Sequence, residues 1–370
     1  MVNMRNKYLS KCLLKDNAEI AQSKHALDFL NRFRKNPIYG YALFAGILIM
    51  LQIMSNSKIV SSSFMTAIGS TIIFCIVGLG FCLLLGYSAL ASLGTAGFIG
   101  IGAYCTYYCL AEWGLTIGIA FAMSIVVALV IGITVGYISL RIEGIYLAIV
   151  TLGIAQIIKE ILSAICDTIK IKGSQIVLFG MESMKLKTTD VFFVLVGVLF
   201  ILMVITHNLM DSPTGRAFLA MKNSTSAAQA FGISLMKYRL LAFTISILYA
   251  AIAGVLYMLY IRYVSNSSST LFTLSTSLNI LGAVIIGGTK SIWGTIGGMF
   301  IIYGIDSMFL QDIKFFRENP TLITLFCGIL VVVVVMFYPG GLAQIVLELK
   351  YKAKGLIKKA KEARYGKDLG

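Results

Sequence analysis

Charged side chains are scarce in this sequence of 370 residues. Asp, Glu, Lys and Arg make up 13% of the chain, apolar residues make up 58%, and the mean hydropathy is +0.88. A soluble domain has about 25% charged residues. A water-soluble fold is excluded, because so few polar groups cannot cover the outside of the molecule. Backbone groups in lipid must be hydrogen-bonded within the chain, which favours helices. The composition therefore predicts an all-α polytopic membrane protein.

Residue types that carry chemistry are also rare. The sequence has two histidines, His25 and His207, and its seven cysteines form no C-x-x-C pair, so the spacing of a metal site is missing. Residues 287–291 end like a phosphate-binding loop, but Thr289 stands where that loop has glycine. No cluster of nucleophile, acid and base occurs within the apolar runs. The sequence predicts no catalytic residue, no metal and no cofactor bound by this chain.

Positive charge is plentiful by comparison. The chain has 31 Lys and Arg against 16 Asp and Glu, a net charge of +15, and eight basic residues precede Pro37 while eight follow Glu348. Nucleic acid is not expected as a partner, since no basic stretch alternates with aromatic residues as a base-stacking surface would. Basic segments beside membrane spans stay on the cytoplasmic side. We expect two such segments, residues 1–37 and an amphipathic tail, 341–370.

Long apolar runs divide the rest of the chain, 38–340, into about ten helical segments. A helix needs about 20 mainly apolar residues to span a bilayer. By that measure the segments are 38–54, 63–86, 89–110, 115–140, 144–163, 190–208, 239–261, 271–287, 292–310 and 321–338. The third is expected to be broken or re-entrant, because glycines weaken a helix. Ten spans place both termini on one side of the membrane, the cytoplasmic side by the distribution of basic residues.

The stretch 209–238 is polar and helix-prone, and it separates two strongly apolar runs. Ser212, or the aspartate before it, suits the N-cap of a helix with Pro213 at its first position. A second short helix is expected over 224–231 and would end at Gly232. Its spacing predicts one shared apolar side formed by Ala227, Ala228 and Phe231. Such a helix suits docking into a groove on another protein, and a loop on the bilayer surface fits the same composition.

At this stretch the sequence resembles a known family. Residues 226–232 (SAAQAFG) resemble the EAA-x-x-x-G signature of ABC-importer permeases, and 215–217 (GRA) precede it at a suitable distance. Residues 141–152 resemble the R-x-x-G-I-Y-x-A-x-x-T-L stretch of branched-chain amino-acid permeases. Residues 286–298 resemble their glycine-rich run, and 339–342 (PGGL) resemble their exit from the last span. The chain is therefore similar to the M-type subunit of the branched-chain amino-acid ABC transporter permease family.

The resemblance implies a permease domain over 38–340 whose cytoplasmic coupling loop is 209–238. It implies a second homologous permease, two cytoplasmic ATPases that bind ATP, and an extracytoplasmic solute-binding protein, in a bacterial-type cytoplasmic membrane. The implied ATPase-coupling residues are Gly215, Arg216, Ser226, Ala227, Ala228, Phe231, Gly232 and Ile233. Candidates for lining the pathway are glycines at irregular backbone and polar residues within the spans. They are Gly94, Gly97, Gly100, Gly102, Tyr146, Thr151, Gln156, Asn279, Gly287 and Gly288.

Two alternatives to an importer of leucine, isoleucine and valine stay open. One is a related permease for urea, short amides or sugars. The other is an ion-coupled secondary carrier, which normally keeps a carboxylate near the middle of the membrane. The nearest candidate, Asp306, lies four residues from the end of its predicted span. The sequence therefore favours an ATP-driven importer over an ion-coupled carrier, and either of them over an enzyme.

Overall fold

The computed structural model describes residues 37–57, 61–142, 144–166, 168–171, 188–265, 272–310, 320–338, 340–345 and 348. The chain divides into two units, Met1–Met50 and Leu51–Gly370. The predicted basic segment 1–37, except Pro37, and most of the predicted tail 341–370 lie outside the described residues. All ten predicted spans are helical over most of their length. The prediction of an all-α membrane protein is confirmed, since six described helices are long and apolar enough to cross a bilayer and two more are shorter and apolar.

The elements follow one another as successive helices with one pair of short strands. In chain order they are α2 (Pro37–Asn56), α3 (Ser62–Phe81), the π-helical turn η1 (Cys82–Tyr87), α4 (Thr95–Tyr107), the π-helical turn η2 (Tyr108–Glu112), α5 (Ile117–Ser139), α6 (Ile145–Ile165), β1 (Thr168–Lys170), α7 (Thr188–Asp211), α8 (Pro213–Asn223), α9 (Thr225–Ala230), α10 (Leu235–Ile261), β2 (Tyr263–Ser265), α11 (Leu274–Gly287), α12 (Ile292–Met299), the π-helical turns η4 (Phe300–Gly304) and η5 (Asp306–Leu310), and α14 (Pro320–Phe337).

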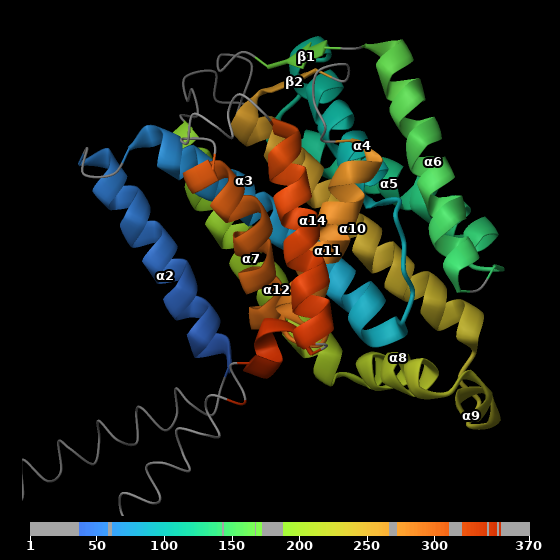
Figure 1. The fold of residues 1–370 in the computed structure, drawn as a ribbon. Coiled ribbons are helices and arrows are strands. Elements are labelled where there is room, and N and C mark those ends of the chain that lie inside the picture. Colours follow the sequence, from blue (N-terminus) through green and yellow to red (C-terminus); the bar gives the residue numbers. More distant parts are fainter. Residues whose placement is uncertain are drawn as a thin grey trace, which may run out of the picture. The chain divides into compact units, whose positions relative to one another are not determined.

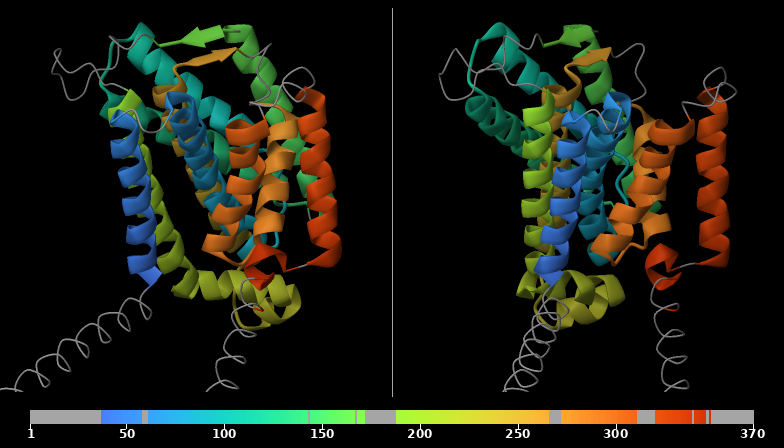
Figure 2. Two further views of the ribbon diagram at one scale, coloured as in Figure 1. Left: turned by 60° about the vertical axis from the view of Figure 1, so that its left-hand side comes forward. Right: turned by 90° about the vertical axis from the view of Figure 1, so that its left-hand side faces the viewer.

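Within Leu51–Gly370 the long helices run back and forth between two ends of a bundle (Figures 1 and 2). One end carries α8 and α9 and is called the elbow end. The other carries the antiparallel pair of β1 and β2 and is called the ladder end; Ile169 pairs with Val264 there, and both are buried. The Tyr104 hydroxyl donates to the Cys166 carbonyl oxygen at 2.7 Å and ties α4 to this end. This strand pair was not predicted from the sequence.

The core of the bundle forms around α10, which packs against α3, α4 and α5. The contact of α10 with α4 is the closest, because each helix presents a glycine to the backbone of the other. A Cβ atom on Gly254 would collide with the carbonyl oxygen of Ile99, and one on Gly102 would collide with that of Ala251. Small residues allow such an approach where lipid supplies no hydrophobic drive between helices. This contact fixes the position of α4, the helical part of the third predicted span.

The third predicted span is broken, as expected. Residues 89–94 are not helical, Ala89 has a φ of +56°, and α4 begins only at Thr95. Immediately before the break, η1 widens the end of the preceding helix into a π-helical turn. Such turns are rare and occur frequently at functional sites. The chain therefore reaches the elbow end, returns as an extended segment, and completes the crossing as α4 (Figure 1).

Candidate functional site

The α8–α9 elbow, residues 213–232, projects from the elbow end and runs across the direction of the spanning helices (Figure 1). The predicted cap is confirmed, because the Ser212 hydroxyl accepts the Gly215 N–H at 3.3 Å and Pro213 begins α8. Position 215 has room only for glycine, because a side chain there would collide with the carbonyl oxygens of the last turn of α7. Phe218 is fully buried and packs edge-on against Tyr238 at 6.2 Å. The elbow is therefore anchored firmly on the bundle.

The second helix of the elbow, α9, is also bounded as predicted. The Ser224 hydroxyl accepts the Ala227 N–H at 3.2 Å, and Gly232, with a φ of +80°, follows the last turn. The prediction of one shared apolar side is wrong: Ala228 is 2% exposed, whereas Ala227 is exposed and Phe231 is 86% exposed. Phe231 lies at the C-cap, where the backbone leaves the helix. Ala228 thus seats α9 on the bundle while Phe231 is presented outward.

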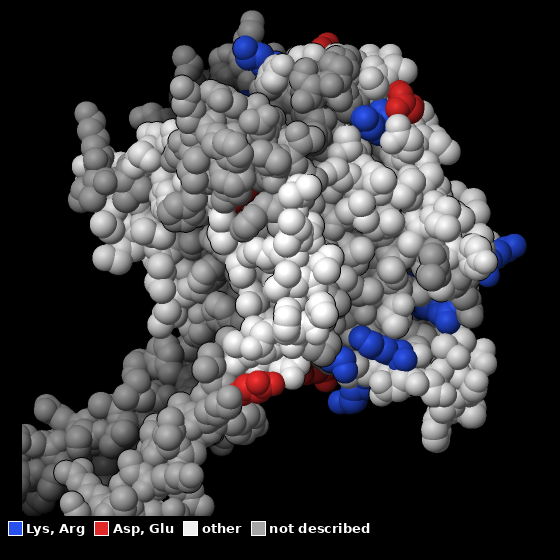
Figure 3. Space-filling view, in the orientation of Figure 1, with Lys and Arg blue, Asp and Glu red and all other residues white. Residues whose placement is uncertain are grey.

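The other predicted coupling residues lie around this outward surface. Ser226 is exposed on α9, and Ile233 is half-buried, with its N–H donated to the Ala228 carbonyl oxygen at 3.0 Å. Arg216 is exposed on α8 and reaches the Asp211 carbonyl oxygen at 3.5 Å. Figure 3 shows Lys and Arg side chains gathered near α8 and α9, below a largely uncharged band of helices. The elbow therefore offers an exposed aromatic ring within a basic surface.

Three segments converge where the elbow meets the bundle. The Lys222 ammonium, in the last turn of α8, donates to the Gly86 carbonyl oxygen of η1 at 2.7 Å. Gly86 also abuts the turn between α11 and α12, since a side chain at Gly86 would collide with the Thr289 carbonyl oxygen. The Cys82 thiol lies 3.1 Å from that same oxygen. We call Gly86, Lys222 and Thr289 the hinge cluster, which joins the elbow to the segment directly before the broken span.

Lys222 sits in an environment that disfavours its charge. Burial lowers the pKa of its ammonium group, and the neighbouring charge of Lys290 lowers it further. The Gly86 carbonyl oxygen is the partner that offsets this cost. Sequence reasoning missed Lys222, because a lysine in the last turn of a helix is expected simply to complement the helix dipole. Lys222 is distinguished only by its hydrogen bond to the Gly86 carbonyl oxygen, 136 residues away in the chain.

Beyond the hinge cluster, hydroxyl groups from two other helices hold the extended segment 89–94 and the first turn of α4 that follows it. The Thr151 hydroxyl of α6 accepts the Leu93 N–H at 3.0 Å, and the Ser277 hydroxyl of α11 accepts the Ala96 N–H at 3.2 Å. These bonds satisfy backbone groups that a continuous helix would have paired internally. Two of the predicted pathway residues, Gly94 and Thr151, are buried here, next to each other. Hydrogen bonds from neighbouring helices therefore stabilise the break.

The remaining pathway candidates are spread over the bundle. Gly97 and Gly100 face α6, where an added Cβ would lie 3.1 Å from Ala155 and 2.9 Å from Leu162, and Gly102 faces α10. The other five occupy three further places, and their roles stay predictions. Gly287 and Gly288 are buried against the backbone of residues 294 and 340, Asn279 lines a cavity of about 470 Å³ between α11 and α14, and Tyr146 and Gln156 are exposed on the outer face of α6.

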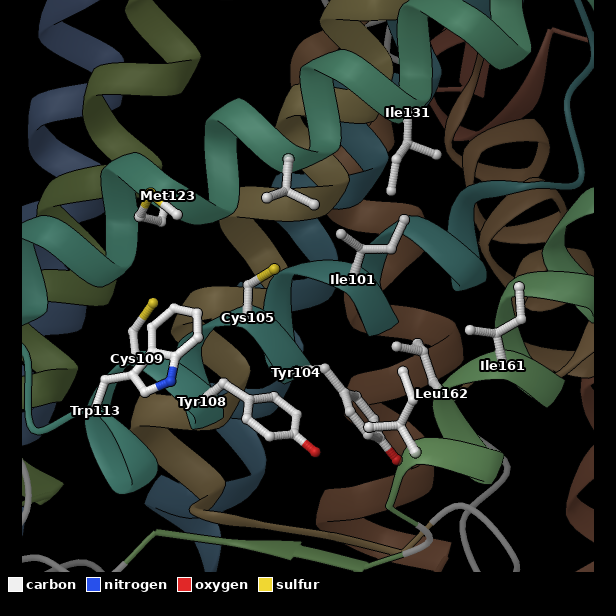
Figure 4. Close-up of a pocket in the computed structure, with 12 residues that line it drawn as sticks. Ile101, Tyr104, Cys105, Tyr108, Cys109, Trp113, Met123, Ile131, Ile161 and Leu162 are labelled. Carbon is white, nitrogen blue, oxygen red and sulfur yellow. The ribbon is translucent and has the colours of Figure 1, made fainter.

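A second cavity, of about 320 Å³, lies between α4, η2, α5 and α6 (Figure 4). Its lining is apolar and includes the rings of Tyr104, Tyr108 and Trp113 together with Met123 and Ile161. Such a lining suits aliphatic chains, whether of lipid or of a solute, and offers no charged group for a polar ligand. Within the described part of the chain no three His, Cys, Asp or Glu side chains lie close enough to hold a metal ion.

Comparisons with known proteins agree with this architecture. The family model for "Branched-chain amino acid transport system / permease component" matches residues 63–335. The high-affinity branched-chain amino acid transport system permease protein LivM of Escherichia coli (strain K12) is 30% identical over 301 residues, which cover 74% of this chain and 68% of LivM. LivM of Salmonella typhimurium (strain LT2) gives the same values.

A more distant similarity is confined to part of the chain. The autoinducer 2 import system permease protein LsrC of Enterobacter sp. (strain 638) is 32% identical over 114 residues, which cover 30% of this chain and 33% of LsrC. No solved structure matches the chain. The family model covers both the broken span and the α8–α9 elbow. This multi-pass membrane protein therefore belongs to the branched-chain amino acid transport system family of ABC transporter permeases.

Proposed function

We propose that this chain is the permease subunit of an ATP-driven importer for branched-chain amino acids. It pairs with a second homologous permease, two cytoplasmic ATPases and an extracytoplasmic solute-binding protein, and it binds no cofactor itself. The similarity to LivM supports the substrate class. The observation that carries the coupling is the α8–α9 elbow, which is anchored by Phe218 and Ala228 yet presents Phe231 at 86% exposure outside the spans. A large exposed ring on a rigid support is typical of a docking anchor.

The orientation follows from charge. Arg216, Lys222, Lys237 and Arg239 lie in or just after the elbow, against a single carboxylate, Asp211, before it. Short connections rich in Lys and Arg stay in the cytoplasm. The elbow end then faces the cytoplasm with both termini, and the ladder end faces the solute-binding protein.

The proposed coupling runs from the ATPases to the broken span. When the ATPases close on ATP they move α9, and Lys222 carries that movement to Gly86 because the two are joined directly. Gly86 is three residues from the start of the extended segment 89–94, which shifts against Thr151 and Ser277. Extended backbone, which lacks the internal hydrogen bonds of a helix, is easier to displace than a continuous helix. Leucine, isoleucine and valine pass along the pathway beside this segment.

The test is uptake by purified components. Proteoliposomes that contain both permeases and the ATPases, supplied with the binding protein, should accumulate radiolabelled leucine only when ATP is present on the elbow side. Unlabelled isoleucine and valine should compete, whereas urea, amides and sugars should not. Competition by autoinducer 2 alone would instead favour the solute named for LsrC, to which part of the chain is similar. Uptake that an ionophore abolishes at constant ATP would contradict the proposal.

Replacing Lys222 by Met should uncouple ATP hydrolysis from transport. A hydrogen bond from a charged group contributes about 1.5–3 kcal/mol, so we expect leucine transported per ATP hydrolysed to fall about tenfold or more. Lys237→Met is the matched control, because Lys237 is exposed in the first turn of α10 and no bond from it to η1 occurs among the described residues. If Lys222→Met kept the coupling ratio while Lys237→Met did not, the hinge cluster would have no part in transmission.

A further inference from the structure

The helix α6 stands at the rim of the bundle and exposes one whole side (Figure 1). Its inner side, which packs against α4, carries Leu147, Thr151, Ala155, Ile158 and Leu162, all buried. The opposite side exposes Tyr146, Ile149, Gln156, Ile157 and Glu160. At 100° per residue these five positions fall within about 100° of one another and centre directly opposite the buried row. The outer side therefore has a composition of its own.

That outer side is polar at a depth where lipid would be expected. Gln156 is the twelfth of the 21 residues of α6, close to its middle, and its amide Nε2 donates to Glu160 Oε1 at 2.7 Å. Glu160 lies five residues, about 7.5 Å, from the end of the helix. A carboxylate and an amide that face hydrocarbon cost several kcal/mol and normally face protein or water instead. Their mutual hydrogen bond leaves further acceptor oxygens on both side chains.

Other exposed sides of the bundle look different. The outer side of α5 shows Ile119, Met123, Val126, Val130 and Ile133, and that of α14 shows Leu325, Ile329, Val332 and Met336. In α5 and the described part of α14 no exposed amide or charged side chain occurs, and those of α7 (Asp190, Asn208 and Asp211) lie within four residues of an end of the helix. These sides suit contact with lipid. The exposed side of α6 therefore differs from those of α5 and α14, because it carries an amide and a carboxylate.

The outer side of α6 also permits a close neighbour. Gly153 lies between Ile149 and Gln156 on this side, and an added Cβ there would meet no atom within 4 Å. Tyr146, 71% exposed, lies at the elbow end of the same row. A small residue flanked by groups that form hydrogen bonds is the usual composition of a contact between membrane helices. We call Tyr146, Gly153, Gln156 and Glu160 the α6 stripe.

We propose that the α6 stripe lies against a spanning helix of the second permease, beside a water-filled pathway, and has no contact with lipid. The proposal rests on the proposed function in that it takes a second permease as the partner. The facing helix supplies hydrogen-bond donors for the free acceptor oxygens of Gln156 and Glu160, and Gly153 lets it approach closely. The continuous apolar sides of α5 and α14 then form the lipid boundary.

The experiment compares cysteines on the stripe with cysteines on the lipid boundary. Gly153→Cys and Gln156→Cys are made in a version of the chain whose seven native cysteines are replaced and whose uptake is retained, and Val130→Cys on α5 is the matched control. The assembled transporter in proteoliposomes is treated with a charged methanethiosulfonate, which modifies thiols in water. We expect the two stripe cysteines to react at least tenfold faster than Val130→Cys and to be cross-linked to the second permease by a short bifunctional maleimide.

Each outcome decides a different point. Stripe cysteines that react as slowly as Val130→Cys, or that form no cross-link, overturn the inference even if uptake stays ATP-driven. Stripe cysteines that react and form cross-links support it even if uptake proves independent of ATP, which would overturn only the proposed function. A cross-link between two copies of this chain also supports the inference and identifies the second permease as another copy. Glu160→Leu should then weaken assembly, whereas Val130→Leu should not.

Discussion

Replacing Phe231 by Ala should nearly abolish ATP-driven leucine uptake by detaching the ATPases. Phe231 is 86% exposed at the end of α9, outside the spans, while the rest of the elbow is held by buried Phe218 and Ala228. An exposed ring of this size gains its stabilisation only when a partner covers it. Truncating such an anchor costs about 2–4 kcal/mol of binding free energy, which is about a 30- to 1,000-fold weaker complex.

The measurement is the dissociation constant between the permease pair and the ATPases in detergent, with uptake measured in parallel. Because Phe231 is 86% exposed, its truncation removes little packing within the chain, and the variant should fold and insert normally. Tyr263→Ala is the matched control, since Tyr263 is a half-exposed aromatic residue of β2 at the ladder end. It should leave binding of the ATPases unchanged. Equal binding by the wild-type protein and Phe231→Ala would show that the ring has another role.

The elements that the sequence predicted are those fixed by local signals. The apolar runs set the spans to within a few residues, so that the predicted 239–261 corresponds to α10, Leu235–Ile261. The ends of α8 and α9 follow from Ser212, Pro213 and Gly232, because capping and positive φ depend on one or two residues each. A break in 89–110 was predicted from its glycines and is present, but it lies at 89–94, whereas Gly97, Gly100 and Gly102 lie within the continuous helix α4. Each of these features depends on residues that are close together in the sequence, and none depends on a contact with a distant helix.

The features that escaped prediction depend on partners far away in the chain. The Thr151 and Ser277 hydroxyl groups hold the break by accepting hydrogen bonds from backbone N–H groups that are 58 and 181 residues away in the chain. Lys222 meets Gly86 across 136 residues. A threonine, a serine or a lysine in a helix has many ordinary uses, so its type alone does not reveal such a contact. Gln156 was predicted to line the pathway, but its hydrogen bond to Glu160 and the outward orientation of both side chains were not predicted from the sequence.

The second large effect is expected at the contact of α4 with α10. Replacing Gly254 by Val should destabilise the protein strongly, because the Cβ atom alone would collide with the Ile99 carbonyl oxygen and would approach the Ala103 nitrogen at 3.0 Å. Neither atom can move without shifting the whole of α4. Overpacking a core costs about 1–3 kcal/mol and sometimes more, and a collision with rigid backbone belongs at the upper end. Gly254→Ala should already show a large share of the loss.

The measurement is the apparent melting temperature of the purified chain in detergent. A loss of about 3 kcal/mol corresponds to a decrease of about 6–12 °C for a domain of a few hundred residues. Gly197→Val on α7 is the matched control, since an added Cβ at Gly197 meets nothing within 4 Å, and it should change the melting temperature by about 2 °C at most. Because α4 carries the broken span, Gly254→Val should also lower uptake more than the loss of folded protein explains. Equal melting temperatures for the two variants would mean that α4 and α10 separate at little cost, and a flexible contact of that kind could not hold the break in place.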